Sequence, residues 1–203
     1  AEAYANAHLG ILKSNDSREN SFEVDAVTVN PFLGTDSVLP FIKLARKNGK
    51  GVFILVKTSN PSSKEIQDRK CNNKTIYQIV ANQVNKLGKD LIDKSGYSPI
   101  GAVVASTNPK ITDNLRNIMP NTYFLVPGFG AQRASLKNIA KCFNPNGYGA
   151  IVNSSRGITY AYNLSPWKEK YGTKHWECAV EEAVIKMNND LKEVTGKIRK
   201  KKS

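Results

Sequence analysis

The sequence predicts an α/β protein that holds the last five βα units of a (β/α)8 TIM barrel. Five short apolar or β-branched runs alternate with helix-forming stretches, and strict alternation is typical of α/β architecture. The runs at 52–56 and 100–105 are largely apolar, as in parallel strands that helices cover on both faces. The first expected element is a helix without a preceding strand. We therefore favour part of a barrel over a five-stranded doubly wound sheet.

The first three elements follow from residue type. The alanine-rich segment 1–12 predicts a helix, and the β-branched segment 22–29 predicts a short strand. A loop with Asn, Pro and Gly then leads to Thr35 or Asp36, either of which can cap a helix that runs to about residue 47.

The rest of the chain repeats the order of strand and helix. Short apolar runs bounded by Gly, Pro or Asn predict strands, and longer stretches with spaced apolar residues predict helices. The expected strands are 52–56, 100–105, 123–126 and 149–152, and the expected helices are 75–92, 110–118, 131–143 and 175–194.

Composition predicts one globular domain over residues 1–196. A chain of 203 residues that is 40% hydrophobic can bury one sizeable core. No apolar run is long enough to cross a membrane, and no signal peptide is recognisable. The three cysteines are widely spaced and form no Cys-x-x-Cys pair, which argues against a disulfide framework or a metal site. We expect a cytoplasmic protein.

The net charge of +13 raises nucleic-acid binding as a hypothesis. Five of the basic residues lie in the tail 197–203, which we expect to be a solvated, poorly ordered end. No RNA- or DNA-binding motif accompanies the charge, and an enzyme with an anionic substrate also tolerates a positive field. We therefore expect no specific nucleic-acid partner.

Two strand ends carry residues suited to a phosphate. Residues 127–132 read PGFGAQ, in which Gly128 and Gly130 allow backbone N–H groups to approach a ligand, and Gln132 lies near the next helix. Residues 153–158 read NSSRGI, in which the Arg156 guanidinium suits an oxyanion. Taken alone, the first segment could be only a turn that needs glycines, and the second could carry only a surface arginine. Barrel phosphate sites frequently use the loops after strands seven and eight. If the last two expected strands are strands seven and eight of a barrel, both segments lie in those loops.

A third strand end opens a long connection. Lys57 is followed by a polar stretch, which begins a connection of about 16 residues that leads to the helix at 75. Loops of this length are usually functional or disordered. Lys57 is a candidate catalytic base, but a strand-end charge is the interpretation that we favour.

These segments resemble orotidine 5′-phosphate decarboxylase, and most closely its longer bacterial and apicomplexan-like subfamily. The similar stretches are DAVTVNP at 25–31, LVKTSNP at 55–61, LVPGFGAQ at 125–132 and VNSSRGI at 152–158. The resemblance extends over residues 1 to about 195 in the order and spacing of the strands. It implies a homodimeric barrel, a carboxy-lyase that converts orotidine monophosphate to UMP and CO2 in de novo pyrimidine synthesis, with no cofactor.

The resemblance also implies roles for individual residues. Gln132 matches the glutamine that bridges the pyrimidine and the phosphate, and Arg156 matches the phosphate-binding arginine, with Ser155 beside it at the backbone. Ser59 matches the hydroxyl residue that reads the pyrimidine edge. The loop that binds substrate is shaped by Pro127, Gly128 and Gly130.

One family motif has no counterpart in these 203 residues. The family carries its catalytic lysine and acidic partners in an Asp-x-Lys-x-x-Asp motif at the end of the third strand, before a helix like residues 1–5. We therefore expect the catalytic residues to lie upstream of Ala1 and this chain to be inactive alone. The alternatives are a sugar-phosphate enzyme of the same superfamily, such as a hexulose-phosphate synthase, and a non-catalytic nucleotide- or nucleic-acid-binding module.

Overall fold

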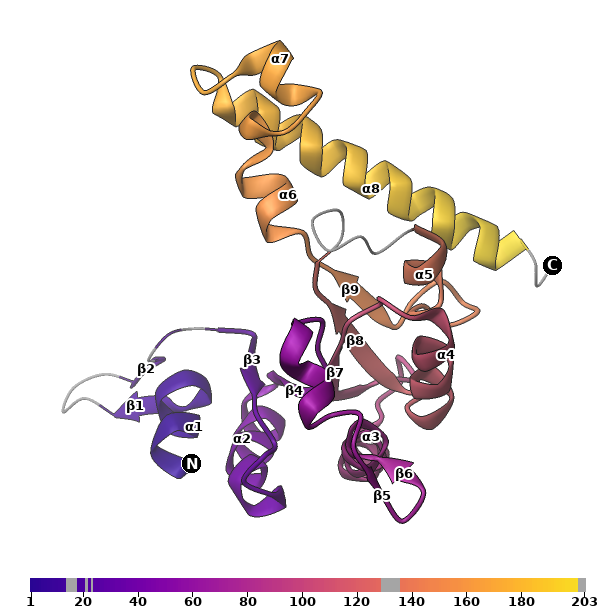
Figure 1. Ribbon diagram of the computed structural model, residues 1–203. Coiled ribbons are helices and arrows are strands. Elements are labelled where there is room, and N and C mark those ends of the chain that lie inside the picture. Colours follow the sequence, from indigo (N-terminus) through magenta and orange to yellow (C-terminus); the bar gives the residue numbers. More distant parts are fainter. Residues whose placement is uncertain (14–17, 21, 23, 129–135, 201–203) are drawn as a thin grey trace. The chain divides into compact units, whose positions relative to one another are not determined.

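The computed structural model describes residues 1–200 apart from 14–17, 21, 23 and 129–135 (Figure 1). Two compact units make up the chain. Unit 1 comprises residues 1–104 and 117–125, and unit 2 comprises residues 105–116 and 126–203.

A five-stranded sheet provides the frame of the fold. Its strands are β3 (Ala26–Val29), β4 (Gly51–Lys57), β7 (Ser98–Val104), β8 (Thr122–Val126) and β9 (Ala150–Val152), and they lie in that order. Pairing is parallel from β3 through β8. The predicted α/β class with parallel strands in sequential order is confirmed. Strand β7 is buried over nearly its whole length, as its apolar run predicts, whereas β4 alternates buried and half-buried residues.

In unit 1, helices α2 (Thr35–Asn48) and α3 (Ile76–Gly88) pack against β4 and β7. Helix α2 is capped by Gly49, whose left-handed φ of 66° turns the chain so that Lys50 N–H donates to Ala45 O (2.8 Å). Helix α3 begins with a capping box between Thr75 and Gln78. The turn η2 (Lys89–Leu91) continues α3, so the predicted helix 75–92 is confirmed in outline. The core between these helices and the sheet includes Val38, Ile42, Val52, Ile54, Ala81, Val84, Ile100 and Phe124.

The N-terminal helix is shorter than predicted. Helix α1 (Glu2–Leu9) packs against α2 and ends because Gly10 takes an extended conformation. Residues 11–13 form β1 (Ile11–Lys13), which pairs with β2 (Arg18–Asn20) in an antiparallel hairpin. The prediction of one helix over 1–12 is therefore wrong at its end, and β3 begins later than the predicted strand 22–29.

The long connection after β4 has structure of its own. It contains η1 (Pro61–Glu65) and an antiparallel hairpin of β5 (Lys70–Cys71) and β6 (Lys74–Thr75). Asn72 and Asn73 form the hairpin turn with positive φ values of 50° and 62°, which asparagine tolerates better than most residues. The sequence predicted a functional or disordered loop here. The connection is folded against the start of α3, so the disordered alternative is wrong and a functional role stays a prediction.

In unit 2, most of the short helices pack along one long helix. The elements are α4 (Pro109–Ile118, shared with unit 1), α5 (Leu136–Ala140), α6 (Ser155–Thr159), η3 (Ala161–Asn163), α7 (Trp167–Tyr171) and α8 (Trp176–Lys200). A small core of Ala161, Ala179 and Ala183 joins η3 to α8. Lys170 and the Tyr171 hydroxyl donate hydrogen bonds to Glu182, which hold the pKa of that carboxyl below its ordinary value.

Two features of unit 2 differ from the sequence prediction. Helices α6 and α7 were not predicted, because each spans only five residues, α6 contains Gly157 and α7 directly follows Pro166. Helix α8 continues to Lys200, past the predicted end at Val194. Lysine and arginine are good helix formers, so a basic run can prolong a helix that apolar packing has begun. The boundary between a domain over 1–196 and a tail over 197–203 stays a prediction.

Candidate functional site

The residue at the end of β4 is a buried lysine with a partner. The Lys57 side chain is 7% exposed, and its Nζ lies 2.7 Å from Asp68 Oδ1. The same ammonium lies 5.5 Å from the centre of the Tyr77 ring, within the range of a cation–π contact. Lys57 is therefore engaged in holding the connection that follows it. This arrangement favours the interpretation of Lys57 as a strand-end charge over that of a catalytic base.

The next residues carry the predicted pyrimidine-reading serine. Thr58 N–H donates to Gln67 Oε1 (3.0 Å), and Gln67 Nε2 donates to Thr58 Oγ1 (2.8 Å). Ser59 follows at once and is half-buried. Its hydroxyl lies just beyond the C-terminal end of a parallel strand. Residues at such strand ends are the ones that α/β folds present to ligands.

The segment after β8 begins with Pro127 and Gly128, both half-buried. Gly128 has a φ of 86°, a conformation that disfavours any residue with a Cβ. The glycine turn predicted from the PGFGAQ motif is therefore present at its first glycine. Gly130 and Gln132 lie outside the described residues.

The segment after β9 lies beside the end of β8. Asn153 N–H donates to Val126 O (3.1 Å), and Asn153 Nδ2 lies 3.4 Å from Ser155 Oγ. Ser154 is buried, whereas Ser155 and Arg156 are exposed in the first turn of α6. The structure thus brings together two of the predicted segments, Pro127–Gly128 and Ser155–Arg156, at the C-terminal ends of neighbouring strands.

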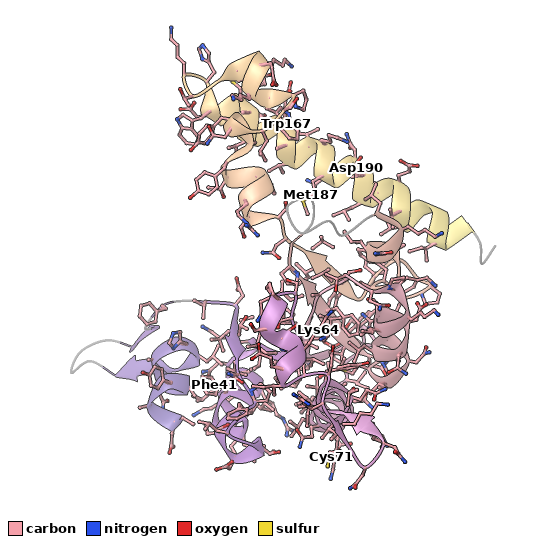
Figure 2. All side chains as sticks on the ribbon, in the orientation of Figure 1. Phe41, Lys64, Cys71, Trp167, Met187 and Asp190 are labelled. Atoms are coloured by element: carbon pink, nitrogen blue, oxygen red, sulfur yellow. The ribbon has the colours of Figure 1, made fainter. Side chains whose placement is uncertain are left out.

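The Arg156 side chain lines a cavity of about 730 Å³ within unit 2. Trp167 of α7 and Met187 of α8 contribute apolar walls, and Asp190 lies on the same helix as Met187 (Figure 2). Asp190 pairs with Lys186 at 3.1 Å. Among the residues that the structure describes, no carboxylate forms an ion pair with Arg156.

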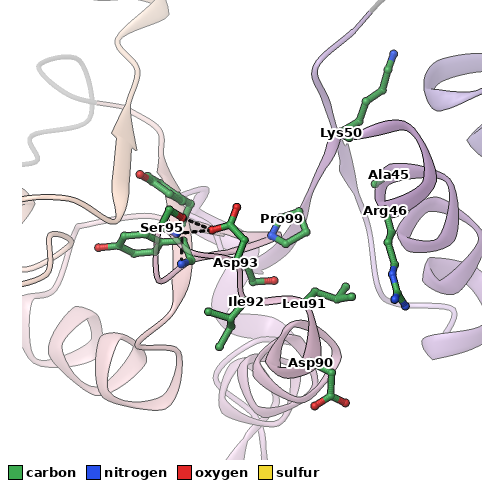
Figure 3. A pocket seen from close by; sticks show the side chains of 13 residues that line it. Ala45, Arg46, Lys50, Asp90, Leu91, Ile92, Asp93, Ser95 and Pro99 are labelled. Atoms are coloured by element: carbon green, nitrogen blue, oxygen red, sulfur yellow. Dashed lines mark hydrogen bonds between the residues drawn. The ribbon is translucent and has the colours of Figure 1, made fainter.

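A second cavity lies at the opposite ends of the strands, in unit 1. It measures about 550 Å³ and is lined by Arg46 and Lys50, by Pro99 near the start of β7, and by Asp93 and Ser95 (Figure 3). Asp93 accepts hydrogen bonds from the Ser95 hydroxyl (2.5 Å) and N–H (2.8 Å), which hold its pKa below the ordinary value. Residues at the N-terminal ends of barrel strands serve stability rather than chemistry. We therefore place the candidate site at the other end of the strands.

The residues that the structure describes carry neither a metal cluster nor a membrane-spanning helix. In these ranges, no group of three or more His, Cys, Asp or Glu side chains is arranged to hold a metal ion. No helix in the described part of the chain has the length and apolar character needed to cross a bilayer.

The sequence did not identify Gln67 and Asp68 as partners of the β4 end. Both lie in the connection that follows β4, nine and eleven residues from the groups that they contact. The available signal was a strand-end lysine followed by a long polar loop that contains an acid. The fold of that loop was needed to show which acid and which amide turn back to the strand.

Comparison with known proteins identifies relatives over most of the chain. The model of the orotidine 5′-phosphate decarboxylase / HUMPS family matches residues 13–169. The orotidine 5′-phosphate decarboxylase of Rhodopirellula baltica is 44% identical over 192 residues, which are 95% of this chain and 63% of the relative. That of Caldicellulosiruptor bescii is 44% identical over 162 residues, or 80% of this chain and 53% of the relative.

A solved structure shares the fold. The putative orotidine-monophosphate-decarboxylase of Toxoplasma gondii superposes with a TM-score of 0.75 at 28% identity, over 100% of this chain and 65% of that one. The chain therefore spans less than two thirds of the length of the proteins that it matches. The family model covers most of its residues, including those at both segments around Pro127 and Arg156. This chain belongs to the orotidine 5′-phosphate decarboxylase / HUMPS family.

Proposed function

We propose that this chain carries the phosphate- and pyrimidine-binding residues of an orotidine 5′-phosphate decarboxylase, which converts orotidine monophosphate to UMP and CO2 in pyrimidine synthesis. The observation that carries the proposal is the hydrogen bond from Asn153 N–H to Val126 O. It supports a shared role for Pro127–Gly128 and Ser155–Arg156, which the sequence had linked by their expected places after barrel strands seven and eight and by family resemblance. The relatives named above carry this activity in their names.

In this proposal, Arg156 binds the substrate phosphate. Its exposed guanidinium has no described carboxylate partner, and the planar fork of N–H donors matches two phosphate oxygens at once. Ser155 contributes at the backbone beside it. Gly128 and Gly130 let the chain approach the phosphate, Pro127 shapes the start of that loop, and Gln132 bridges the phosphate and the pyrimidine.

Ser59 reads the pyrimidine edge in the same proposal. Its hydroxyl can both donate and accept a hydrogen bond, which suits the alternating carbonyl and N–H groups of that edge. The site requires no cofactor or metal ion. The protein acts as a homodimer in the cytoplasm, with residues 1–196 as barrel and 197–203 as a basic tail. Orotidine monophosphate and UMP are its ligands, and nucleic acid and membranes are not.

Catalysis makes a further demand on the site. Decarboxylation leaves negative charge on the pyrimidine ring, and a preorganised cation is the direct way to stabilise charge that develops in the transition state. The family motif Asp-x-Lys-x-x-Asp does not occur in these 203 residues. We therefore assign to this chain the binding of the substrate and not the protonation step.

Calorimetric titration of the 203-residue chain with UMP tests the proposal. Removing one partner of a desolvated charge pair costs about 2–5 kcal/mol, so Arg156→Ala should weaken UMP binding about 30-fold or more. Arg46→Ala removes an equal charge from an exposed position on α2, at the opposite ends of the strands, and should leave the affinity unchanged. Equal affinity of wild type and Arg156→Ala would refute the assignment.

The same titration separates the alternatives. A sugar-phosphate enzyme of the superfamily would bind ribose 5-phosphate as tightly as UMP, because its site has no use for the base. A nucleic-acid-binding module would bind a single-stranded oligonucleotide with strong salt dependence and little dependence on Arg156. The proposal expects UMP to bind more tightly than either competitor.

A further inference from the structure

We propose that Gln67 is a positioning residue that holds Ser59 in place to recognise the pyrimidine, with Asp68 as its accessory. The inference rests on the proposed role of Ser59. It concerns the connection between β4 and α3, which the resemblance to known decarboxylases does not assign.

The Gln67 carboxamide makes two hydrogen bonds to one residue. Its Oε1 accepts from Thr58 N–H at 3.0 Å, and its Nε2 donates to Thr58 Oγ1 at 2.8 Å. Thr58 Oγ1 in turn donates to Asn60 Oδ1 at 2.6 Å. The residues on both sides of Ser59 are therefore tied to each other, and one of them is tied to Gln67.

Gln67 is itself fixed to regular structure. Its N–H donates to Ser63 O (2.8 Å), and its carbonyl accepts from Tyr77 N–H (3.1 Å) in the first turn of α3. Helix α3 packs on β4 and β7. The carboxamide is thus supported by a rigid element, which is what a residue needs if it is to set the position of another.

The neighbouring pair strengthens the attachment. Asp68 binds the buried ammonium of Lys57 at 2.7 Å, so consecutive residues of the connection hold consecutive residues at the end of β4. Lys57 is itself buried against Tyr77. Two successive attachments fix the direction in which the chain leaves the strand, and hence the direction of the Ser59 side chain.

This arrangement predicts that a variant without the Gln67 carboxamide loses affinity for ligands that carry the pyrimidine base. Displacing the Ser59 hydroxyl removes its hydrogen bond to the pyrimidine, whereas a phosphate bound elsewhere on the chain keeps its contacts. Gln67→Met removes both hydrogen bonds and keeps nearly the same side-chain volume. It should weaken UMP binding about tenfold, which corresponds to about 1.4 kcal/mol, and leave ribose 5-phosphate binding unchanged.

Titrations of the full 203-residue chain with UMP and with ribose 5-phosphate test the inference. Gln67→Glu keeps an acceptor for Thr58 N–H and should recover part of the UMP affinity. Gln83→Met makes the same replacement at an exposed position on α3 and should match wild type for both ligands. A Gln67→Met variant that binds UMP as wild type does, or that loses both ligands equally, would overturn the inference.

Amide hydrogen exchange separates this inference from the proposed function. In Gln67→Met, the amides of Thr58 and Ser59 should exchange faster, while those of β7 keep their protection. Unchanged exchange at Thr58 and Ser59 would refute the positioning role whatever the ligand data show. If Ser59→Ala leaves UMP affinity unchanged while Gln67→Met still accelerates exchange, the proposed role of Ser59 fails and the positioning by Gln67 stands.

Discussion

A buried arginine should contribute strongly to the stability of the segment that leads to the candidate phosphate site. Arg116 of α4 is 8% exposed, and its Nη2 donates to Cys142 O at 2.7 Å and to Gly149 O at 2.8 Å. These two carbonyls bracket the segment between α5 and β9. The guanidinium therefore holds both ends of the chain that enters β9.

The expected cost of Arg116→Met follows from these contacts. A hydrogen bond to a charged group contributes about 1.5–3 kcal/mol, so two contribute about 3–6 kcal/mol. Relief of the cost of burying the guanidinium offsets part of this, because methionine is apolar and fills much of the space of the arginine stem. We expect a net loss of about 2–4 kcal/mol in the free energy of unfolding. Arg116→Lys keeps the charge but not the fork, and should fall between wild type and Arg116→Met.

Urea unfolding of the 203-residue chain measures this loss as a lower midpoint with an unchanged slope. Arg46→Met is the matched control, because Arg46 is exposed, and it should shift the free energy of unfolding by less than about 0.5 kcal/mol. A loss below about 1 kcal/mol in Arg116→Met would show that these carbonyl contacts do not stabilise the fold.

Further predictions concern the cysteines and a close contact in the sheet. Burial raises the pKa of the Cys142 thiol to about 11, whereas Cys71 and Cys178 are exposed, so a thiol reagent should label two cysteines quickly and Cys142 only on unfolding. Because the folded state holds the Cys142 proton more tightly than the unfolded chain does, its contribution to stability is full below about pH 9 and declines as the pH rises to about 11. Cys142→Ala should reduce that decline when the free energy of unfolding is measured against pH. An equal decline in the variant and the wild type would contradict the raised pKa of Cys142. Gly101→Ala would place a Cβ in steric overlap with the Phe53 ring, and calorimetric melting should show a loss of about 1–3 kcal/mol in stability. Wild-type stability of this variant would contradict the predicted overlap.

The frame of the fold was predictable because its signals are local. The apolar run at 52–56 and the largely apolar run at 100–105 identify β4 and β7 without any knowledge of their neighbours. Helix α2 carries a left-handed glycine at its C-terminal end, and Thr75 carries a capping box, both of which are short-range features. Such elements depend on residues within a few positions of each other.

The parts that the sequence missed depend on longer-range contacts. The pairing of Lys57 with Asp68, and of Thr58 with Gln67, requires the β4–α3 connection to fold back on the strand. Two-residue strands such as β5 offer no hydrophobic periodicity to recognise. The role of Arg116 is also invisible in sequence, because its acceptors are backbone carbonyls 26 and 33 residues away.

The candidate site was predictable in part, by residue type and family resemblance. Pro127, Gly128, Ser155 and Arg156 lie at neighbouring strand ends, as their order after the last two strands suggests. Resemblance alone assigned the roles of Ser59 and Gln132, and those roles stay predictions. The neighbourhood of Arg156, with Trp167 and Met187 in one cavity, came only from the structure.

The structure of the 203-residue chain with UMP bound tests the central claim most directly, because it shows where the phosphate lies. The account predicts phosphate oxygens within hydrogen-bonding distance of the Arg156 guanidinium and of the Ser155 backbone N–H, at the end of β9. A bound UMP whose phosphate contacts neither group, whether it lies against the basic C-terminal residues or at the starts of the strands near Arg46, would contradict the account.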